Sequence, residues 1–175
     1  GFEDAVVEVA RKYVAEVGEL KEDFLRNLYI YRKENTGGKP VVMLDAHSDE
    51  VAFVVHSIKP NGCLRFILHG AWNRNTLMGT KVMVRNADGE YLPGIIAAKP
   101  SHFMSAAEKA SGAPDISNMV IDIGATSYED AVENFHVRMG EPVVPATRFF
   151  HDEAHGLLFG KAFDCRIGCA AMIEA

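Results

Sequence analysis

An acid and a histidine lie directly after an apolar stretch of the chain. His47 and Asp49 follow Val41 to Leu44 and are two positions apart, so on an extended backbone both side chains point the same way. In that geometry the histidine can bind a metal ion while the carboxylate orients its ring. A hydrogen-bonded histidine in a loop after a strand gives the same local sequence, so the pair alone does not decide between these two roles.

A second candidate is Asp164, which opens a predicted helix near the end of the chain. A carboxylate at a helix start is favoured by the free N–H groups and by the helix dipole. An ordinary N-cap, with Arg166 as a nearby counter-charge, is therefore the alternative to a functional role.

The remaining histidines are less informative. His151 and His155 are four apart with acids between them, as in the helical zinc motif, but Asp rather than Glu follows the first histidine and a strand-like run comes after. We therefore expect a solvated hairpin turn there. Four others are expected to be structural or to lie in a turn: His56, His69, His102 and His136. Nothing matches a nucleophile elbow, a phosphate-binding glycine loop or a dinucleotide fingerprint.

Several elements must position these residues. The spacing of apolar residues predicts an amphipathic helix over Glu3 to Val17, stopped by Gly18. Leu28 to Tyr31 is β-prone, and the continuous apolar run Val41 to Leu44 is typical of a strand buried inside an α/β sheet. The tail from Lys161 to Ala175 is predicted to begin a helix with small residues along one side. No capping residue follows, so we expect a fragment of a longer protein.

The middle of the chain has a different sequence pattern. Short β runs alternate with turn residues, which is typical of a barrel or sandwich. The predicted strands are Val51 to Ile58, Cys63 to Leu68, Lys81 to Arg85, Tyr91 to Ala97 and Met119 to Ile123. Asp88-Gly89 predicts a hairpin. Further expected features are a short helix in Ser101 to Ala110, a helix capped at Ser127 and ending near Asn134, a strand at Val143-Val144, and a last hairpin of Thr147 to Phe150 with Leu157 to Phe159.

Composition excludes several classes of function. The 175 residues carry a net charge of -6 and 48% hydrophobic residues, which fits a globular protein of one full domain or two small ones. The charge disfavours nucleic-acid and membrane partners, and no apolar run reaches the length of about 20 residues that a membrane span needs. The three cysteines form no CxxC pair, and Cys165 and Cys169 fit small buried residues. Because no leader sequence is visible either, we expect a cytoplasmic protein.

Ordered blocks of sequence resemble the glutamyl aminopeptidase family of dinuclear metallopeptidases. This family includes the tetrahedral, self-compartmentalised aminopeptidases and some members labelled endoglucanase. The blocks span essentially the whole chain and are Gly1 to Asp4, Leu44 to Phe53, Ile121 to Ala125, Gly140 to Pro145 and Gly160 to Gly168.

The resemblance implies an α/β catalytic domain, a hydrolase-like sheet with helices, that is incomplete here. Its parts would be residues 1–50 and 146–175. A β-rich, PDZ-like barrel domain over residues 51–145 would be inserted between them and would mediate assembly into a homo-oligomer. The change after Asp49 to short β runs separated by turn residues agrees with this division independently.

The resemblance also implies roles for the candidate residues. His47 matches a metal ligand, Asp49 the catalytic-site acid that orients it, and Asp164 the carboxylate that bridges two divalent cations. Such sites hold Zn or Co, with Mn as a further candidate, and activate a water for attack on a peptide carbonyl. Cys165 departs from the family, which has Asp or Asn at this position and a cis peptide bond before it.

We therefore expect part of a metal-dependent aminopeptidase that removes N-terminal residues from peptides. The chain alone is expected to be inactive, because the family's general base and remaining ligands lie beyond Ala175. A separation of about 10 Å or more between the His47 and Asp164 side chains would contradict this expectation. A non-catalytic oligomerisation or peptide-docking scaffold is the main alternative. An endoglucanase ranks last, because Asp49 and Glu50 point to opposite sides of an extended backbone.

Overall fold

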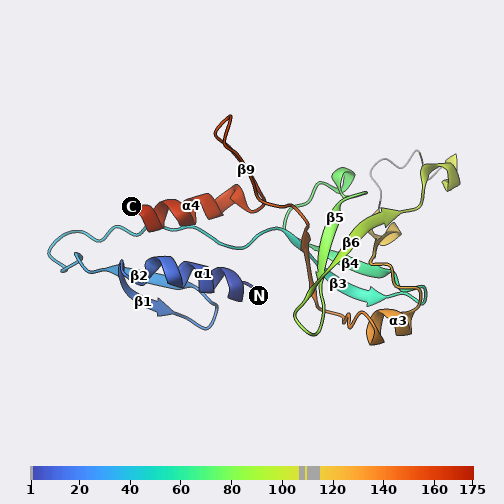
Figure 1. The fold of residues 1–175 in the computed structure, drawn as a ribbon, viewed down its shortest axis with the longest axis horizontal. Helices are drawn as coiled ribbons and strands as arrows, with labels where there is room; N and C mark the ends of the chain where they lie inside the picture. Colours follow the sequence, from blue (N-terminus) through green and yellow to red (C-terminus); the bar gives the residue numbers. More distant parts are fainter. Residues whose placement is uncertain (1, 107–108, 110–114) are drawn as a thin grey trace. The chain divides into compact units, whose positions relative to one another are not determined.

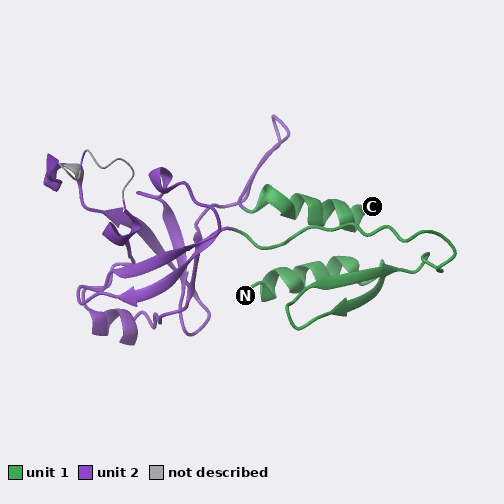
Figure 2. Ribbon diagram, turned by 180° about the vertical axis from the view of Figure 1, so that it is seen from behind, with its two compact units in different colours: residues 1–50, 162–175 green, residues 51–161 purple. Residues whose placement is uncertain are grey.

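The structure, a computed structural model, describes residues 2–106, 109 and 115–175 (Figure 1). The chain forms two compact units: Gly1–Glu50 with Ala162–Ala175, and Val51–Lys161 (Figure 2). Residues 146–161, which we expected in the first domain, thus belong to the second unit. No helix of the described residues is both long enough and apolar enough to cross a membrane.

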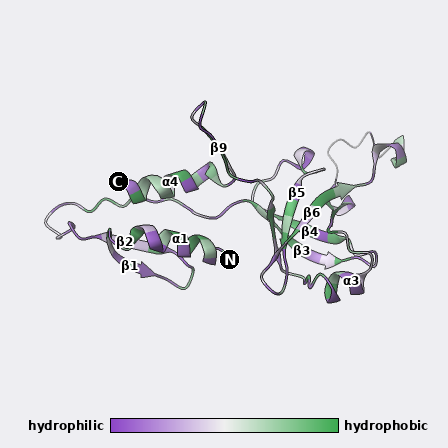
Figure 3. Ribbon diagram, viewed as in Figure 1, coloured by the Kyte–Doolittle hydropathy of each residue, from purple (hydrophilic) through white to green (hydrophobic). Residues whose placement is uncertain are grey.

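The first unit begins with the predicted amphipathic helix, α1 (Asp4–Val14), which ends before Gly18. Val7 and Val14 are buried on one face, and Figure 3 shows hydrophobic and hydrophilic residues alternating around the helix. Two antiparallel strands follow, β1 (Gly18–Glu22) and β2 (Leu28–Arg32). The β2 prediction is confirmed. The polar β1 sequence gave no comparable signal, because its strand conformation depends on the pairing with β2.

The stretch Val41–Leu44 differs from its prediction as a buried strand. It belongs to no strand of the described residues, and its four side chains are 63% to 81% exposed. A strand is stabilised by a hydrogen-bonded neighbour, and no described segment pairs with this one. The last element of the unit, α4 (Phe163–Glu174), confirms the predicted helix. It lies beside the extended chain that leads to His47 (Figures 1 and 2).

The second unit is built on a closed antiparallel barrel, which confirms the barrel pattern. Its strand order is β3-β4-β7-β6-β5-β8. The bounds are Ala52–Ile58 for β3, Leu64–His69 for β4, Lys81–Arg85 for β5, Tyr91–Ala98 for β6, Met119–Asp122 for β7 and Pro142–Pro145 for β8. The Asp88-Gly89 hairpin joins β5 to β6, with Gly89 at φ +84. That positive φ is the conformation that glycine adopts without steric cost.

Alternating residues of these strands fill the barrel. Phe53 is fully buried, stacks on Trp72 with ring centroids 4.5 Å apart, and meets Phe66 edge to face at 5.3 Å. The Trp72 indole N–H donates to the Ala52 carbonyl at 3.0 Å, so its polar edge is satisfied at the barrel wall. This cluster holds β3, β4 and the loop after β4 together.

Short helices and one hairpin complete the second unit. Helix α3 (Tyr128–Glu133) begins at Ser127, whose hydroxyl accepts from the Asp130 N–H at 3.1 Å, as the sequence predicts. Three 3₁₀ turns are η1 (Arg74–Thr76), η2 (Ser101–Phe103) and η3 (Ile116–Asn118). Of the helix expected over Ser101 to Ala110, residues 107, 108 and 110 lie outside the described residues. The last predicted hairpin is confirmed as β9 (Phe150–Asp152) with β10 (Leu157–Phe159), although its first strand begins later than expected.

Candidate functional site

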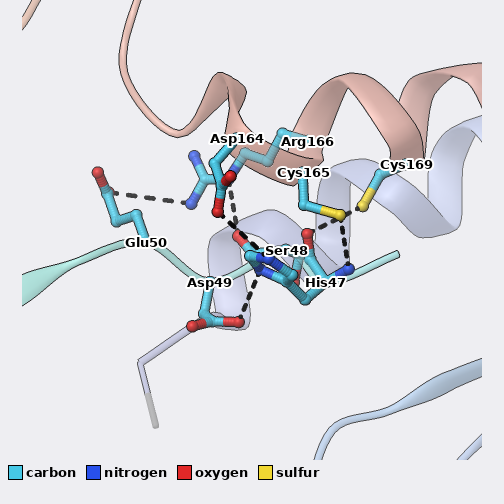
Figure 4. Close-up of polar contacts among 8 residues, drawn as sticks. All are labelled: His47, Ser48, Asp49, Glu50, Asp164, Cys165, Arg166 and Cys169. Carbon is cyan, nitrogen blue, oxygen red and sulfur yellow. Dashed lines mark hydrogen bonds and ion pairs between the residues drawn. The ribbon is translucent and has the colours of Figure 1, made fainter. Parts of the chain in front are cut away.

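His47 lies between two carboxylates of the first unit. Its Nδ1 is 3.2 Å from Asp49 Oδ1, and its Nε2 is 3.4 Å from Asp164 Oδ2 (Figure 4). All three side chains are at least half exposed. The structure therefore brings together the three residues that the sequence singles out, at far less than the separation of about 10 Å that would contradict a shared site.

Asp164 does not cap α4. The N-cap is Ala162, which has a left-handed backbone with φ 60, and no side chain makes a capping bond there. Asp164 lies in the first turn, and its carboxylate is directed at the His47 ring (Figure 4). The alternative of an ordinary N-cap is therefore wrong.

Three side chains of α4 contact the backbone next to His47. The His47 N–H donates to Cys165 Sγ at 3.3 Å, and Cys169 Sγ donates to the His47 carbonyl at 3.4 Å. Arg166 donates from Nε to the Ser48 carbonyl at 2.7 Å, and its guanidinium is 3.9 Å from Glu50 Oε1. We expected Arg166 to be a counter-charge to Asp164, but these contacts join it to Ser48 and Glu50 in the stretch after His47.

The two cysteines thus do more than fill space. Burial raises the pKa of the Cys169 thiol, and the neighbouring Cys165 adds to the effect while Arg166 opposes it. A raised pKa keeps the thiol protonated at neutral pH, and the protonated form is the one that can donate to the His47 carbonyl. All three cysteines of the chain are free.

Two histidines of the second unit also contact carboxylates. His155 Nδ1 is 2.8 Å from Asp152 Oδ2 in the turn between β9 and β10, which confirms a hairpin rather than a helical zinc motif. His136 Nδ1 contacts Asp88 Oδ2. The sequence around His136 shows no carboxylate partner, and we expected this histidine only to be structural. The contact with Asp88 has no local sequence signal, because it forms only where the barrel joins the β5–β6 hairpin to the segment after α3.

The Nε2 atom of His47 and the Oδ2 atom of Asp164 are spaced like two ligands of one metal ion. Zinc binds imidazole nitrogen and carboxylate oxygen at about 2.0–2.2 Å, and a roughly tetrahedral angle then separates the two donor atoms by about 3.4 Å. The observed Nε2 to Oδ2 distance is 3.4 Å. Among the described residues, however, no group of three or more His, Cys, Asp or Glu side chains could hold a metal ion. The described residues by themselves therefore offer no complete set of metal ligands.

The Asp164–Cys165 peptide bond is trans, because the described residues contain no cis peptide bond. Because Cys165 departs from the family, the sequence left open whether this bond is cis.

Comparison with known proteins identifies the family. Residues 27–175 match the M42 glutamyl aminopeptidase family, and the chain belongs to that family. It is 37% identical to a TET aminopeptidase from the archaeon Thaumarchaeota archaeon SCGC AB-539-E09, with a TM-score of 0.90 over 99% of this chain and 48% of the other. It is 36% identical to the putative aminopeptidase FrvX of Escherichia coli, over 90% of this chain and 43% of that protein.

A third relative is a TET1 peptidase of Pyrococcus horikoshii, described as assembling into a tetrahedron or a large octahedral shell. It is 29% identical, with a TM-score of 0.81 over 99% of this chain and 50% of the other. The chain spans about half the length of the curated relatives it matches.

Proposed function

We propose that this chain is part of a metal-dependent aminopeptidase that removes N-terminal residues from peptides. Membership of the M42 glutamyl aminopeptidase family supports the activity. The single observation that carries the metal site is the contact of His47 Nε2 with Asp164 Oδ2 at 3.4 Å.

The chemistry of that contact calls for a positive charge between the two atoms. When Nδ1 carries the ring proton and donates to Asp49, the Nε2 lone pair faces the Asp164 carboxylate, and both atoms are acceptors. A cation or a second ring proton satisfies both. Asp49 would therefore select the tautomer that leaves Nε2 free for a metal ion.

We assign His47 and Asp164 as ligands in a site for two divalent cations, Zn or Co with Mn as a further candidate, and Asp49 as the residue that orients His47. When bound, the cations would supply the activation of a water for attack on the peptide carbonyl. The three side chains are exposed, so a peptide and further ligands can reach them.

The 175-residue chain alone should be inactive. Its described residues provide two metal donors, and a single carboxylate–histidine pair binds a divalent cation weakly. The general base and the other ligands would come from the rest of a longer protein. Three free cysteines favour a reducing compartment, and we place the protein in the cytoplasm.

The test uses the longer parent protein with aminoacyl substrates, with and without a chelator. The chelator should abolish the release of N-terminal residues. His47→Gln and Asp164→Asn should each cost at least the roughly 10–100-fold that is typical of losing a residue that supports a metal ligand. The matched control is His155→Gln, because His155 also contacts a carboxylate but belongs to the β9–β10 turn. Activity that survives both the chelator and the two site variants would refute the proposal.

We further propose that residues 51–145, a PDZ-like insertion, drive assembly into a homo-oligomer. The assembly described for the TET1 peptidase of Pyrococcus horikoshii supports this. The alternative of a scaffold without catalysis shares this property, so light scattering on the chain tests the oligomer and the aminoacyl assay separates the two functions. If residues 51–145 proved strictly monomeric, this would count against the oligomeric enzyme and against the oligomerisation scaffold alike.

Glycoside hydrolysis is the less favoured activity. It needs two carboxylates that face each other across a sugar, one of them as an acid. Here Asp49 and Asp164 both face the His47 ring. Cellulosic substrates offered to the same parent protein should therefore yield no product.

A further inference from the structure

The carbonyl and N–H of His47 are held by two thiols of the same helix. Cys165 accepts from the His47 N–H, and Cys169 donates to the His47 carbonyl (Figure 4). The cysteines are four residues apart on α4, a spacing that puts both side chains on one face of the helix. One face of α4 thus contacts both backbone hydrogen-bonding groups of His47.

These contacts give the His47 backbone its hydrogen-bond partners within the described chain. Every residue brings one backbone donor and one backbone acceptor, and a strand would pair both with its neighbours. Residues 41–51 belong to no strand of the described part of the chain. Here α4 provides the partners instead.

The arrangement links the two candidate ligands by a short path. Asp164 precedes Cys165 directly on α4, so the helix that carries one ligand also holds the backbone of the other. Metal and catalytic sites need their side chains held within about 0.5 Å of the working geometry. A change in how the thiols hold the His47 backbone is therefore expected to change the distance from Nε2 to Asp164 Oδ2.

Gly168 permits the close approach that the thiols need. It lies one turn along α4, and a Cβ placed there would be 3.2 Å from the Ala46 Cβ and 3.6 Å from Cys165 Sγ. Both sulfurs are directed at the His47 backbone rather than at the space between its ring and Asp164 (Figure 4). Their geometry is therefore that of supports and not of ligands.

We propose that Cys165 and Cys169 are positioning residues that hold the His47 backbone and thereby set the spacing of His47 and Asp164. The metal-binding consequence rests on the function proposed above. The positioning itself does not, because it concerns contacts within the metal-free chain.

The test compares Cys165→Ala and Cys169→Ala with Cys165→Ser and Cys169→Ser in the 175-residue chain. Alanine removes the hydrogen bond, whereas the serine hydroxyl can both accept and donate. The first readout is the ¹⁵N signal of the His47 ring without metal, assigned with His47→Gln. Both alanine variants should shift it, and the serine variants should return it towards the wild-type position. Cys63→Ala, in the loop before β4, is the control and should leave it unchanged.

The second readout is the Zn²⁺ affinity of the longer parent protein, measured by calorimetry with the same variants. Each alanine variant should bind about tenfold more weakly, as is typical when a support of a metal ligand is lost, and serine should restore most of the affinity. Unchanged ring signals in both alanine variants would overturn the proposal. If the chelator and His47→Gln leave the activity of the longer parent protein unchanged, but alanine shifts the ring signals and serine restores them, the positioning role stands and the proposed metal site fails.

Amide exchange in the wild-type chain decides the matter if the alanine variants do not fold. The His47 N–H should be protected, because it donates to Cys165 Sγ. Exchange of this amide at the rate of a freely exposed one would overturn the proposal.

Discussion

Gly168 of α4 lies directly against Ala46, the residue before His47. A Cβ added to Gly168 would be 3.2 Å from the Ala46 Cβ, which is closer than side chains normally approach. The absence of a side chain at this one position thus lets α4 come within hydrogen-bonding distance of the His47 backbone. The resulting prediction separates helix propensity from close packing.

Gly168→Val should move α4 away from residues 46–50 and lower the stability of the first unit. Valine has the higher helix propensity of the two residues, by a few tenths of a kcal/mol, so a loss of stability must come from the contact with Ala46. We expect a lower midpoint of thermal unfolding and faster exchange of the His47 amide. Ala170→Val is the control, because Ala170 is exposed on the same helix and should change little. Equal effects of the two variants would contradict the close-packing argument.

Phe53→Ala should destabilise the barrel by about 3–5 kcal/mol, because it removes a fully buried ring. Trp72 is the only tryptophan of the chain and stacks on Phe53 at 4.5 Å, so its fluorescence reports the change directly. We expect red-shifted emission and a lower urea midpoint. Ile67→Ala is the control, since Ile67 is 51% exposed on the adjacent β4 and should cost less than about 1 kcal/mol.

Asn86→Ala should cost the barrel about 1–3 kcal/mol. Asn86 is 3% exposed, and its Oδ1 accepts from the N–H groups of Asp88 at 3.1 Å and Glu90 at 2.9 Å. Removing the amide leaves these donors without their side-chain partner inside the hairpin. Asn73→Ala removes a similar local bond, to the Asn75 N–H at 3.1 Å, from an exposed turn where water can replace it. Urea unfolding should therefore show the larger loss for Asn86→Ala, and an equal loss would contradict this reasoning.

The barrel could be predicted because its signals are local. Phe53 and Val55 alternate with less buried neighbours in β3, and Asp88-Gly89 supplies the turn that a tight hairpin needs. The helix cap at Ser127 could also be predicted, since its partner Asp130 is only three residues away. In each case the pattern and the structure lie within one short stretch of the chain.

The stretch Val41–Leu44 could not be predicted in the same way. Its apolar run is typical of a strand. Whether it forms a strand and is buried depends on the segments that lie beside it, and no described segment pairs with it. Strand β1 was not predicted for a related reason, because its polar residues form a strand only by pairing with β2.

The candidate site was predictable only in part. The spacing of His47 and Asp49 suggested their shared direction, and Asp164 was a candidate from its place at a predicted helix start, whereas its role as a metal ligand came only from the resemblance to a family. The contacts of Cys165 and Cys169 with the His47 backbone bring distant parts of the chain together, and neither periodicity nor motif encodes them. Cysteine is also a common small core residue, so its presence alone favoured the simpler interpretation.

His136 and Asp88 give a prediction for pH. The hydrogen bond that His136 donates to Asp88 raises the pKa of His136 above its ordinary 6.5, the negative charge of Asp88 adds to the effect, and Arg138 opposes it. A pKa raised in the folded state means that the charged imidazolium stabilises folding fully below about 6.5, and that this contribution is lost as the pH rises through the folded-state value. Removing the partner should therefore matter more in acid than in base.

Asp88→Asn should lower the urea midpoint of the barrel at about pH 5.5 and change it much less at about pH 8.5, where the imidazole is neutral in both proteins. In an NMR titration the midpoint of His136 should move down in the variant, because the anionic partner is gone. The backbone bond from the Asp88 N–H to Asn86 Oδ1 is unaffected by the substitution, so the hairpin itself stays intact. Glu129→Gln controls for the general loss of one negative charge, because Glu129 is exposed on α3. A destabilisation that grew with pH would show that the pair stabilises the barrel through something other than the charge of His136.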